Sequence, residues 1–253
     1  MARSDFSTIL ITGATSGIGR ALALAYASPG RNLALTGRDR ERLDAVARAC
    51  EARGAVVRAE ALDILDREGV AAWIDDLDRA LPLDLVIANA GVSGGVAGPS
   101  GDDGRHILAV NVEGVLNTVQ PVIPLMTGRA RGQIAVMSSL AAFRGFPNAP
   151  AYCASKAAVR LYGEGLRGRL ARHGVGVSVI CPGFVRTPLT DANPFPMPFM
   201  IEAEPAAAII LRDLARNRAR IAFPWRLYAL VRLTTALPAW LVDPILARSP
   251  AKE

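Results

Sequence analysis

The sequence predicts an α/β fold, a single Rossmann-type domain in which helices flank a doubly wound parallel sheet of about seven strands. Short apolar runs alternate with amphipathic helical segments along most of the chain. Two of these runs, at residues 85–88 and 134–137, are apolar without alternation, as in strands covered on both faces. The 253 residues contain no linker or shift in composition, so we expect one domain over residues 1–253.

The composition narrows the classes of function. The net charge of +6 is spread along the chain and not gathered in a basic block, which argues against nucleic-acid binding. Three widely spaced cysteines indicate neither disulfides nor a thiolate metal site, and two distant histidines supply neither a zinc cluster nor a Ser-His-Asp hydrolase. We therefore expect chemistry without a metal. No charged leader followed by an apolar core opens the chain, so we also expect a cytoplasmic protein.

A glycine-rich turn joins the first strand to the first helix. The β-branched run 9–11 leads into the turn 12–19, after which a helical segment begins. Gly13, Gly17 and Gly19 would let the backbone turn tightly and approach a pyrophosphate at the helix start. An ordinary glycine-rich loop remains the alternative interpretation.

The end of the second strand, 32–36, indicates which dinucleotide would bind. An acidic residue at this point would accept hydrogen bonds from an NAD ribose, but Gly37 and Arg38 stand here. Because a guanidinium binds phosphate in a bidentate manner, the 2′-phosphate of NADP fits better. We interpret Arg40 and Arg42 as solvated residues in the first turn of the next helix.

The helix expected over 39–53 ends at Gly54, and its periodic apolar residues predict a buried face formed by Leu43, Val46, Ala47 and Cys50. A third strand begins at 56–57 and leads to Asp63, and a further amphipathic helix ends at Pro82. The carboxylate of Asp63 could accept the adenine amino group or cap that helix, and the sequence leaves both open.

Later strands bring polar and glycine residues to the carboxyl edge of the sheet, where ligands of such folds bind. The strand at 85–88 is followed by Asn89-Ala90-Gly91, the strand at 134–137 by Ser138-Ser139, and a strand at 177–180 by Pro182-Gly183 and Thr187-Pro188. We expect a mobile loop over 92–104 at the mouth of the site, followed by a helix from about 103 to 120 that carries Asn111.

A helix over 151–173 would place Tyr152 and Lys156 on one face, four residues apart. An ammonium within a few ångströms would lower the phenol pKa from ~10 toward neutrality, so that Tyr152 could exchange a proton. Of the 29 basic residues only Lys156 and Lys252 are lysine, which favours a specific task for this ammonium. A Tyr-Lys pair on a solvated helix face remains the alternative.

Together these motifs resemble the short-chain dehydrogenase/reductase family over about residues 8–189, since the matching parts occur in the family's order: the turn 12–19, Asn89-Ala90-Gly91, Asn111, Ser139, Tyr152-x-x-x-Lys156 and Pro182-Gly183. The resemblance implies that Tyr152 is the general acid/base and that Ser139 hydrogen-bonds the substrate oxygen, while Ser138 orients Ser139 or touches substrate. It also implies that Lys156 binds the nicotinamide ribose and lowers the pKa of Tyr152, and that Asn111 helps hold a proton-relaying water.

The same resemblance implies the contacts of the cofactor, for which we expect NADP(H) to be preferred over NAD(H). The residues expected to contact it are Gly13, Thr15, Ser16, Gly17, Ile18, Gly19, Arg38, Asp63, Ile64, Asn89, Ala90, Gly91, Tyr152, Lys156, Pro182, Gly183, Val185 and Thr187.

The family pattern gives less guidance beyond residue 190. We expect a variable substrate loop over 189–203, whose proline-stiffened apolar stretch 193–200 forms a lid over a lipophilic substrate or packs against the tail. A helix over 205–217, a strand at 221–223 and a helix over 225–237 follow.

The C-terminal segment 224–253 is unusually apolar but too charged to span a membrane. Packing on the core and a subunit interface, in a homodimer or homotetramer, are favoured over contact with a membrane surface.

The sequence therefore predicts an NADP(H)-dependent oxidoreductase that transfers a hydride between nicotinamide and a carbonyl or secondary alcohol of a lipophilic small molecule. The alternative is a non-catalytic NADP-binding redox sensor or scaffold. The set of Asn111, Ser139, Tyr152 and Lys156 favours the enzyme, because a sensor has no use for a proton relay.

Overall fold

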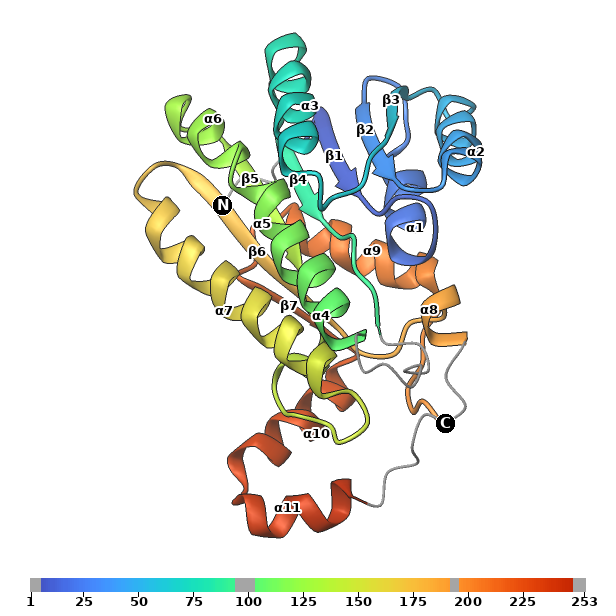
Figure 1. The fold of residues 1–253 in the computed structure, drawn as a ribbon. Coiled ribbons are helices and arrows are strands. Elements are labelled where there is room, and N and C mark those ends of the chain that lie inside the picture. The colour runs from blue at the N-terminus through green and yellow to red at the C-terminus, as the bar shows by residue number, and fades with distance from the viewer. Residues whose placement is uncertain (1–5, 94–102, 192–195, 248–253) are drawn as a thin grey trace.

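The computed structural model describes residues 6–93, 103–191 and 196–247, and these form one seven-stranded parallel sheet with helices on both faces (Figure 1). The strand order is β3-β2-β1-β4-β5-β6-β7, which reverses between β1 and β4 and confirms the doubly wound α/β fold. The strands are β1 (Thr8–Thr12), β2 (Asn32–Gly37), β3 (Val56–Ala61), β4 (Leu85–Ala88), β5 (Gly132–Met137), β6 (Val175–Pro182) and β7 (Arg220–Phe223).

Two hydrophobic cores separate the faces of the sheet. Alternate residues of β1 point to opposite sides, so Ile9 and Ile11 belong to one core and Leu10 to the other. The first core is covered by α1 (Gly17–Tyr26), α2 (Arg40–Glu51) and α9 (Ala203–Leu214). The second is covered by α3 (Arg67–Ala80), α5 (Gly114–Val119), α6 (Val122–Gly128) and α7 (Pro150–Ala171). Cys50 is fully buried in the first core, as its helical spacing predicted.

The segment that carries Asn111 differs from the single helix expected over 103–120. α4 (Asp103–Leu108) passes into a π-helical turn at Ala109–Glu113 before α5 begins. Asn111 lies in this wider turn and is fully buried. Such turns insert an extra residue and re-aim a side chain, which hydrophobic periodicity does not reveal.

The C-terminal segment extends from the carboxyl edge of the sheet as α10 (Trp225–Ala236) and α11 (Ala239–Leu246) (Figure 1). It packs only in part: Leu227, Val231 and Val242 are buried, whereas Trp225 and Trp240 are 71% and 76% exposed. None of the described helices combines the length and the apolar character needed to cross a membrane.

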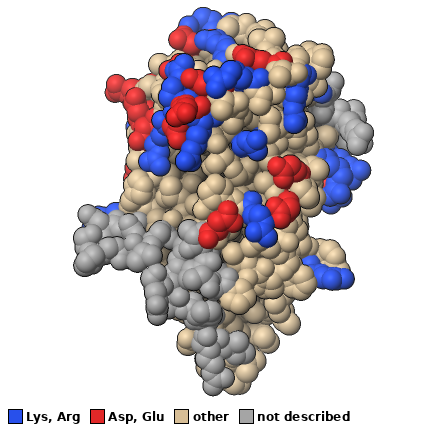
Figure 2. Space-filling view, turned by 90° about the vertical axis from the view of Figure 1, so that its right-hand side faces the viewer, with Lys and Arg blue, Asp and Glu red and all other residues tan. Residues whose placement is uncertain are grey.

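Charge is unevenly distributed over the molecule. Figure 2 shows basic and acidic side chains mixed over the upper part of one face, and few charges on the part that extends below. α2 carries six charged residues of both signs in its sequence RERLDAVARACE, whereas α11 contains a single charged residue, Asp243. Alternating signs of this kind do not form a cationic groove on this face.

Two glycines in α7 provide a test of how this helix packs on the sheet. A Cβ on Gly163 would lie 2.6 Å from Val136 Cγ2 and 2.7 Å from Val179 Cγ2, whereas a Cβ on Gly165 would meet nothing within 4 Å. Gly163→Ala should therefore lower the free energy of unfolding by ~1–3 kcal/mol through overpacking. The matched change Gly165→Ala should raise it by ~0.5–1 kcal/mol, because alanine reduces the entropy of the unfolded helix segment. Chemical denaturation measures both, and equal effects would contradict the close packing of α7 on β5 and β6.

Candidate active site

The glycine turn before α1 has the backbone that an anion site needs. Gly13 and Gly17 have φ of +66° and +52°, and a Cβ on Gly13 would come within 2.7 Å of Ala90 Cα. The side chain of Ser16 precedes α1 without capping it, and the first turn carries no acidic residue. The N–H groups at this helix start are therefore open to an external anion, and the turn fits a dinucleotide pyrophosphate.

Thr12 and Asn89 tie this turn to the end of β4. Thr12 Oγ1 accepts hydrogen bonds from the backbone N–H groups of Asn89 and Ala90, both at 3.1 Å. The Asn89 amide donates to the carbonyl oxygens of Thr12 at 2.9 Å and Gly13 at 3.2 Å. The sequence did not single out Thr12, although a threonine at the strand end before the glycines was a usable signal. The side chain of Asn89 holds the turn in shape, and its contact with a cofactor stays a prediction.

The end of β2 presents a free guanidinium. Arg38 is exposed and makes no ion pair or side-chain hydrogen bond with any described residue. The neighbouring carboxylate of Asp39 is committed to α2, since it accepts from Arg42 N at 3.0 Å and pairs with the Arg42 guanidinium. Arg40 pairs with Asp44 on the solvated face, in agreement with its interpretation from the sequence.

Asp63 does not cap the following helix, so that interpretation is wrong. Its Oδ1 accepts from Leu65 N at 2.9 Å in a local turn, and α3 is capped instead by Asp66, which accepts from Gly69 N at 3.0 Å. The two aspartates lie three residues apart, and only the position of the helix start distinguishes them. Adjacent Ile64 is buried, and its carbonyl accepts from Asn117 Nδ2 at 2.9 Å.

The ammonium of Lys156 is almost completely buried. Only 3% of this residue is exposed, and its Nζ donates to the carbonyl oxygen of Met137 at 3.1 Å. Gly91 makes room for it, because a Cβ there would lie 3.0 Å from Nζ. Burial lowers the pKa of Lys156 to about 8, since the charged form loses its hydration. This group can therefore gain and release a proton near neutral pH.

Tyr152 lies on the same side of α7, with the Lys156 Nζ 5.8 Å from its ring centroid. Burial raises the pKa of Tyr152, and a hydrogen bond with Ser139 offsets only part of this effect. The prediction that Lys156 lowers the phenol pKa is therefore wrong for the chain by itself. Desolvation is the largest cause of the shift, and the ammonium is directed at a backbone carbonyl.

The two serines after β5 have separate tasks. Ser139 Oγ accepts from Ala141 N at 3.1 Å and lies 3.5 Å from the carbonyl oxygen of Pro182, a long contact that leaves its hydroxyl available. Ser138 is 1% exposed and donates to the carbonyl oxygen of Lys156 at 2.8 Å. Ser138 therefore fixes α7 against β5, and its predicted contact with substrate is wrong.

Asn111 fastens the loop after β4 to α7. Its Oδ1 accepts from Val92 N at 2.8 Å, while Nδ2 donates to Val92 O and to Ser155 Oγ, both at 2.9 Å. Both amide hydrogens are thus used within the protein. To bind the predicted water, Asn111 therefore has only the second lone pair of its Oδ1 and its backbone groups. Most of the loop expected over 92–104 lies outside the described residues.

The segment after β6 returns to the glycine turn. Gly183 N donates to Phe223 O at 2.7 Å, and a Cβ on Gly17 would lie 2.9 Å from Thr187 Cγ2. Val185 is buried and pairs with Ile201, which closes the neck of the loop expected over 189–203. The ends of β1, β4, β5 and β6 thus converge at one edge of the sheet, as predicted. No group of His, Cys, Asp or Glu within the described ranges is arranged to hold a metal ion.

Comparison of sequences links this arrangement to known proteins. A family model described as short chain dehydrogenase matches residues 7–194. An uncharacterized oxidoreductase of Myxococcus xanthus (strain DK1622) is 39% identical over 246 residues, which cover 96% of this chain and 97% of that relative. An uncharacterized oxidoreductase of Mycobacterium tuberculosis (strain ATCC 25618 / H37Rv) is 32% identical over 237 residues, which cover 91% and 93%.

Solved structures share the whole fold. A short chain dehydrogenase/reductase from Burkholderia phymatum in complex with NAD is 29% identical, with a TM-score of 0.83 and coverage of 100% of this chain and 99% of that one. A short-chain dehydrogenase from Sphingobium yanoikuyae in complex with NADPH is 25% identical, with a TM-score of 0.79 and coverage of 97% of each chain.

The buried ammonium predicts an unusual dependence of stability on pH. Lys156 has a pKa of about 8 in the fold, whereas a lysine in the unfolded chain titrates near ~10.4. Between these values the unfolded state binds more protons, so this group's contribution to stability rises with pH by about 1 kcal/mol at pH 9. Below pH 8 both states are protonated, and the buried charge is fully destabilising.

The test compares urea unfolding of the wild type and Lys156→Met from pH 7 to pH 9.5. The difference isolates Lys156 from the other groups that titrate in this range, and it should move in favour of the wild type as the pH rises. A difference that stays constant would contradict the burial of a titrating ammonium.

Proposed function

This chain belongs to the short-chain dehydrogenase/reductase family of NAD(P)-dependent oxidoreductases, and we propose that it reduces a carbonyl group with NADP(H), with Tyr152 as the general acid. The observation that carries the proposal is the cluster of Ser139, Tyr152 and buried Lys156 at the sheet edge that also bears the glycine turn. A cofactor-binding sensor would not need this buried ammonium, which costs stability below its pKa.

The protonation states of the cluster favour reduction. When bound, the cofactor supplies a hydride to the carbonyl carbon. Ser139 and Tyr152 donate hydrogen bonds to the oxygen on which negative charge grows, and Tyr152 then gives up its proton. The raised pKa of Tyr152 keeps the phenol protonated at neutral pH, which is the form that a general acid requires. Lys156, with a pKa of about 8, can return a proton to it.

The surrounding residues hold these groups in position. Ser138 fixes the backbone of Lys156, and Asn111 fixes the loop that follows β4. The remaining residues expected to contact the cofactor follow the ends of β1, β2, β3, β4 and β6, and we assign them to its binding. We also propose that the chain acts in the cytoplasm as a homodimer or homotetramer, which the exposed tryptophans of α10 and α11 support.

The preference for NADP(H) rests on the end of β2. The exposed Arg38 has no carboxylate to compete with a 2′-phosphate, because Asp39 is bound to Arg42 and to the start of α2. The solved relatives include complexes with NADPH and with NAD, so the choice within this chain depends on its own residues.

A lid over a lipophilic substrate remains part of the proposal. The pairing of Val185 with Ile201 and the hydrogen bond from Arg186 N to Ile201 O, at 2.9 Å, hold the base of the loop 189–203. Phe199 is 46% exposed near its end, which supports an apolar covering. Residues 192–195 of this loop lie outside the described part of the chain.

Removing the phenol oxygen of Tyr152 tests whether this residue is the general acid. Tyr152→Phe should lower kcat/KM for carbonyl reduction by ~10²–10⁴-fold, because the transition state loses its proton donor. The dissociation constant of NADPH, measured by its fluorescence, should stay within about threefold, since the hydroxyl acts on the substrate. Tyr162→Phe, which removes the same group from another turn of α7, serves as the control. Ordinary turnover by Tyr152→Phe would remove Tyr152 from the mechanism.

Removing one guanidinium tests the choice of cofactor. Arg38→Ala should reduce the ratio of kcat/KM with NADPH to kcat/KM with NADH by ~10–100-fold, as expected for a lost charge-assisted hydrogen bond to phosphate. Arg40→Ala removes a neighbouring guanidinium that is already paired with Asp44, and it should leave the ratio nearly unchanged. If both variants keep the wild-type ratio, Arg38 does not read the 2′-phosphate.

A further inference from the structure

The direction of the Ser139 side chain depends on the turn that follows it. This is a single 3₁₀ turn, and it ends at Phe143. Within it Ala142 N donates to Ser139 O at 3.1 Å, and Phe143 N donates to Leu140 O at 3.3 Å. Ser139 Oγ accepts from Ala141 N at 3.1 Å. Whatever holds the end of this turn therefore also holds the hydroxyl of Ser139.

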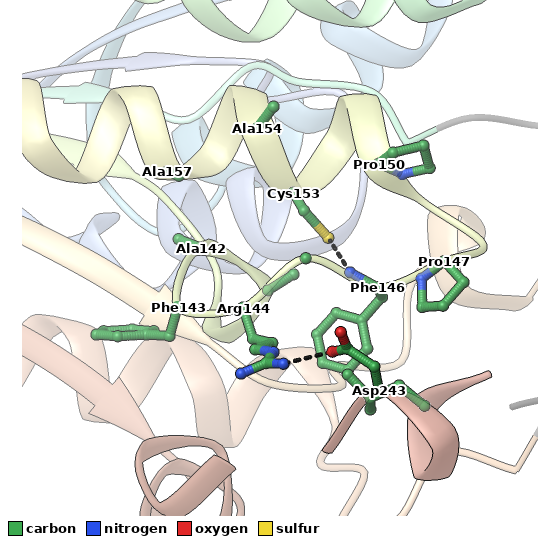
Figure 3. A pocket seen from close by; sticks show the side chains of 13 residues that line it. Ala142, Phe143, Arg144, Phe146, Pro147, Pro150, Cys153, Ala154, Ala157 and Asp243 are labelled. Atoms are coloured by element: carbon green, nitrogen blue, oxygen red, sulfur yellow. Dashed lines mark hydrogen bonds and ion pairs between the residues drawn. The ribbon is translucent and has the colours of Figure 1, made fainter. Parts of the chain in front are cut away.

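The side chains at the end of the turn leave the loop in different directions. The loop forms one wall of a pocket of about 530 Å³ next to α7 (Figure 3). Arg144 pairs with Asp243 of α11 at 2.6 Å and donates to Thr234 O of α10 at 3.2 Å. In Figure 3 the ring of Phe143 points away from Phe146. This ring packs against the second core of the protein.

Three guanidinium groups surround the ring of Phe143. The guanidinium carbons of Arg160, Arg220 and Arg232 lie 4.7, 5.4 and 5.9 Å from the ring centroid. These distances are within the range of cation–π attraction. Tyr228 adds an edge contact, with ring centroids 5.5 Å apart and ring planes at 63°. Because the four partners belong to α7, β7 and α10, one side chain joins the turn to three separate elements.

Two of these guanidiniums have a buried N–H group that the ring can help to satisfy. Arg160 Nε and Arg220 Nε are buried and have no hydrogen-bond partner among the described residues. Their terminal nitrogens are engaged elsewhere, since both side chains pair with Glu164 and Arg220 Nη1 donates to Tyr228 OH at 3.1 Å. A buried donor without an acceptor is costly, and the π face of an aromatic ring accepts weakly from N–H groups. The contacts with Phe143 therefore offset part of this cost.

We propose that Phe143 is a positioning residue, whose ring fixes the turn that directs the Ser139 hydroxyl at the substrate oxygen. The inference rests on the proposed role of Ser139 as a hydrogen-bond donor in the reaction. The near end of the turn is held by Leu140, which is 3% exposed, and the far end by Phe143. A leucine at position 143 would fill much of the same space but would not attract the guanidiniums. The far end would then be released, and a displaced donor stabilises the transition state less.

Steady-state reduction of the ketone that the wild type turns over fastest, with saturating NADPH, tests this role. Phe143→Leu should lower kcat by about 5- to 30-fold, because Ser139 is less well placed. Phe143→Tyr keeps the ring and should stay within about twofold of the wild type. Phe146→Leu removes a ring from the same loop that no described guanidinium contacts, and it should also keep kcat. The dissociation constant of NADPH should stay within about twofold in all three variants. An equal loss of kcat in all three would overturn the proposal.

A double-mutant cycle tests whether the ring acts together with its nearest guanidinium, that of Arg160. The losses of kcat in Phe143→Leu and Arg160→Met should overlap, because each change removes the same contact. The double variant should therefore retain about two- to fivefold more activity than the product of the single losses predicts. Losses that multiply independently would overturn the cation–π contact as the source of the effect.

Hydrogen exchange gives a readout that needs no turnover. The backbone N–H of Ala142, which bonds to Ser139 O, should exchange about tenfold faster or more in Phe143→Leu, and near the wild-type rate in Phe143→Tyr and Phe146→Leu. If no ketone is reduced, the proposed function fails, and exchange alone then decides whether Phe143 holds the turn. Unchanged exchange in Phe143→Leu would overturn the inference, as would faster exchange with an unchanged kcat.

Discussion

The burial of the Lys156 ammonium is the constraint on which the active-site architecture depends. A charge removed from water requires compensation, and among the described residues the backbone carbonyl of Met137 accepts a hydrogen bond from this ammonium at 3.1 Å. The result is a depressed pKa of about 8 and a helix, α7, that must lie closely against β5. The missing side chain at Gly91 and the hydrogen bond of Ser138 to the Lys156 backbone both serve this placement.

The C-terminal helices pack against elements at the same edge of the sheet. α10 joins the second core through Leu227 and Val231, and Asp243 of α11 pairs with Arg144, which belongs to the loop after Ser139. The apolar tail is therefore neither wholly core nor wholly surface. Its buried side chains anchor it, Asp243 and Leu246 line a pocket, and Trp225 and Trp240 remain exposed.

Local patterns in the sequence determined most of the fold and singled out the residues to which the proposal gives the chemistry. Every expected strand is present, because a continuous apolar run bounded by glycine or polar residues has few other solutions. The spacing of Tyr152 and Lys156 placed them together, because the α-helix repeats every 3.6 residues. Gly13 and Gly17 adopt the positive φ that only glycine adopts readily, so their residue type already implied the turn.

Only the tertiary structure decided the features that depend on distant groups. The pKa of Tyr152 moves upward because the atoms that surround it in the fold remove water from the phenol, and no neighbour in sequence indicates this desolvation. The π-helical turn at Asn111 accompanies hydrogen bonds to Val92 and Ser155, and the choice of Asp66 over Asp63 as helix cap depends on where α3 starts. Arg144 and Asp243 stand 99 residues apart, so their ion pair and the pocket behind it arise only when the chain is folded.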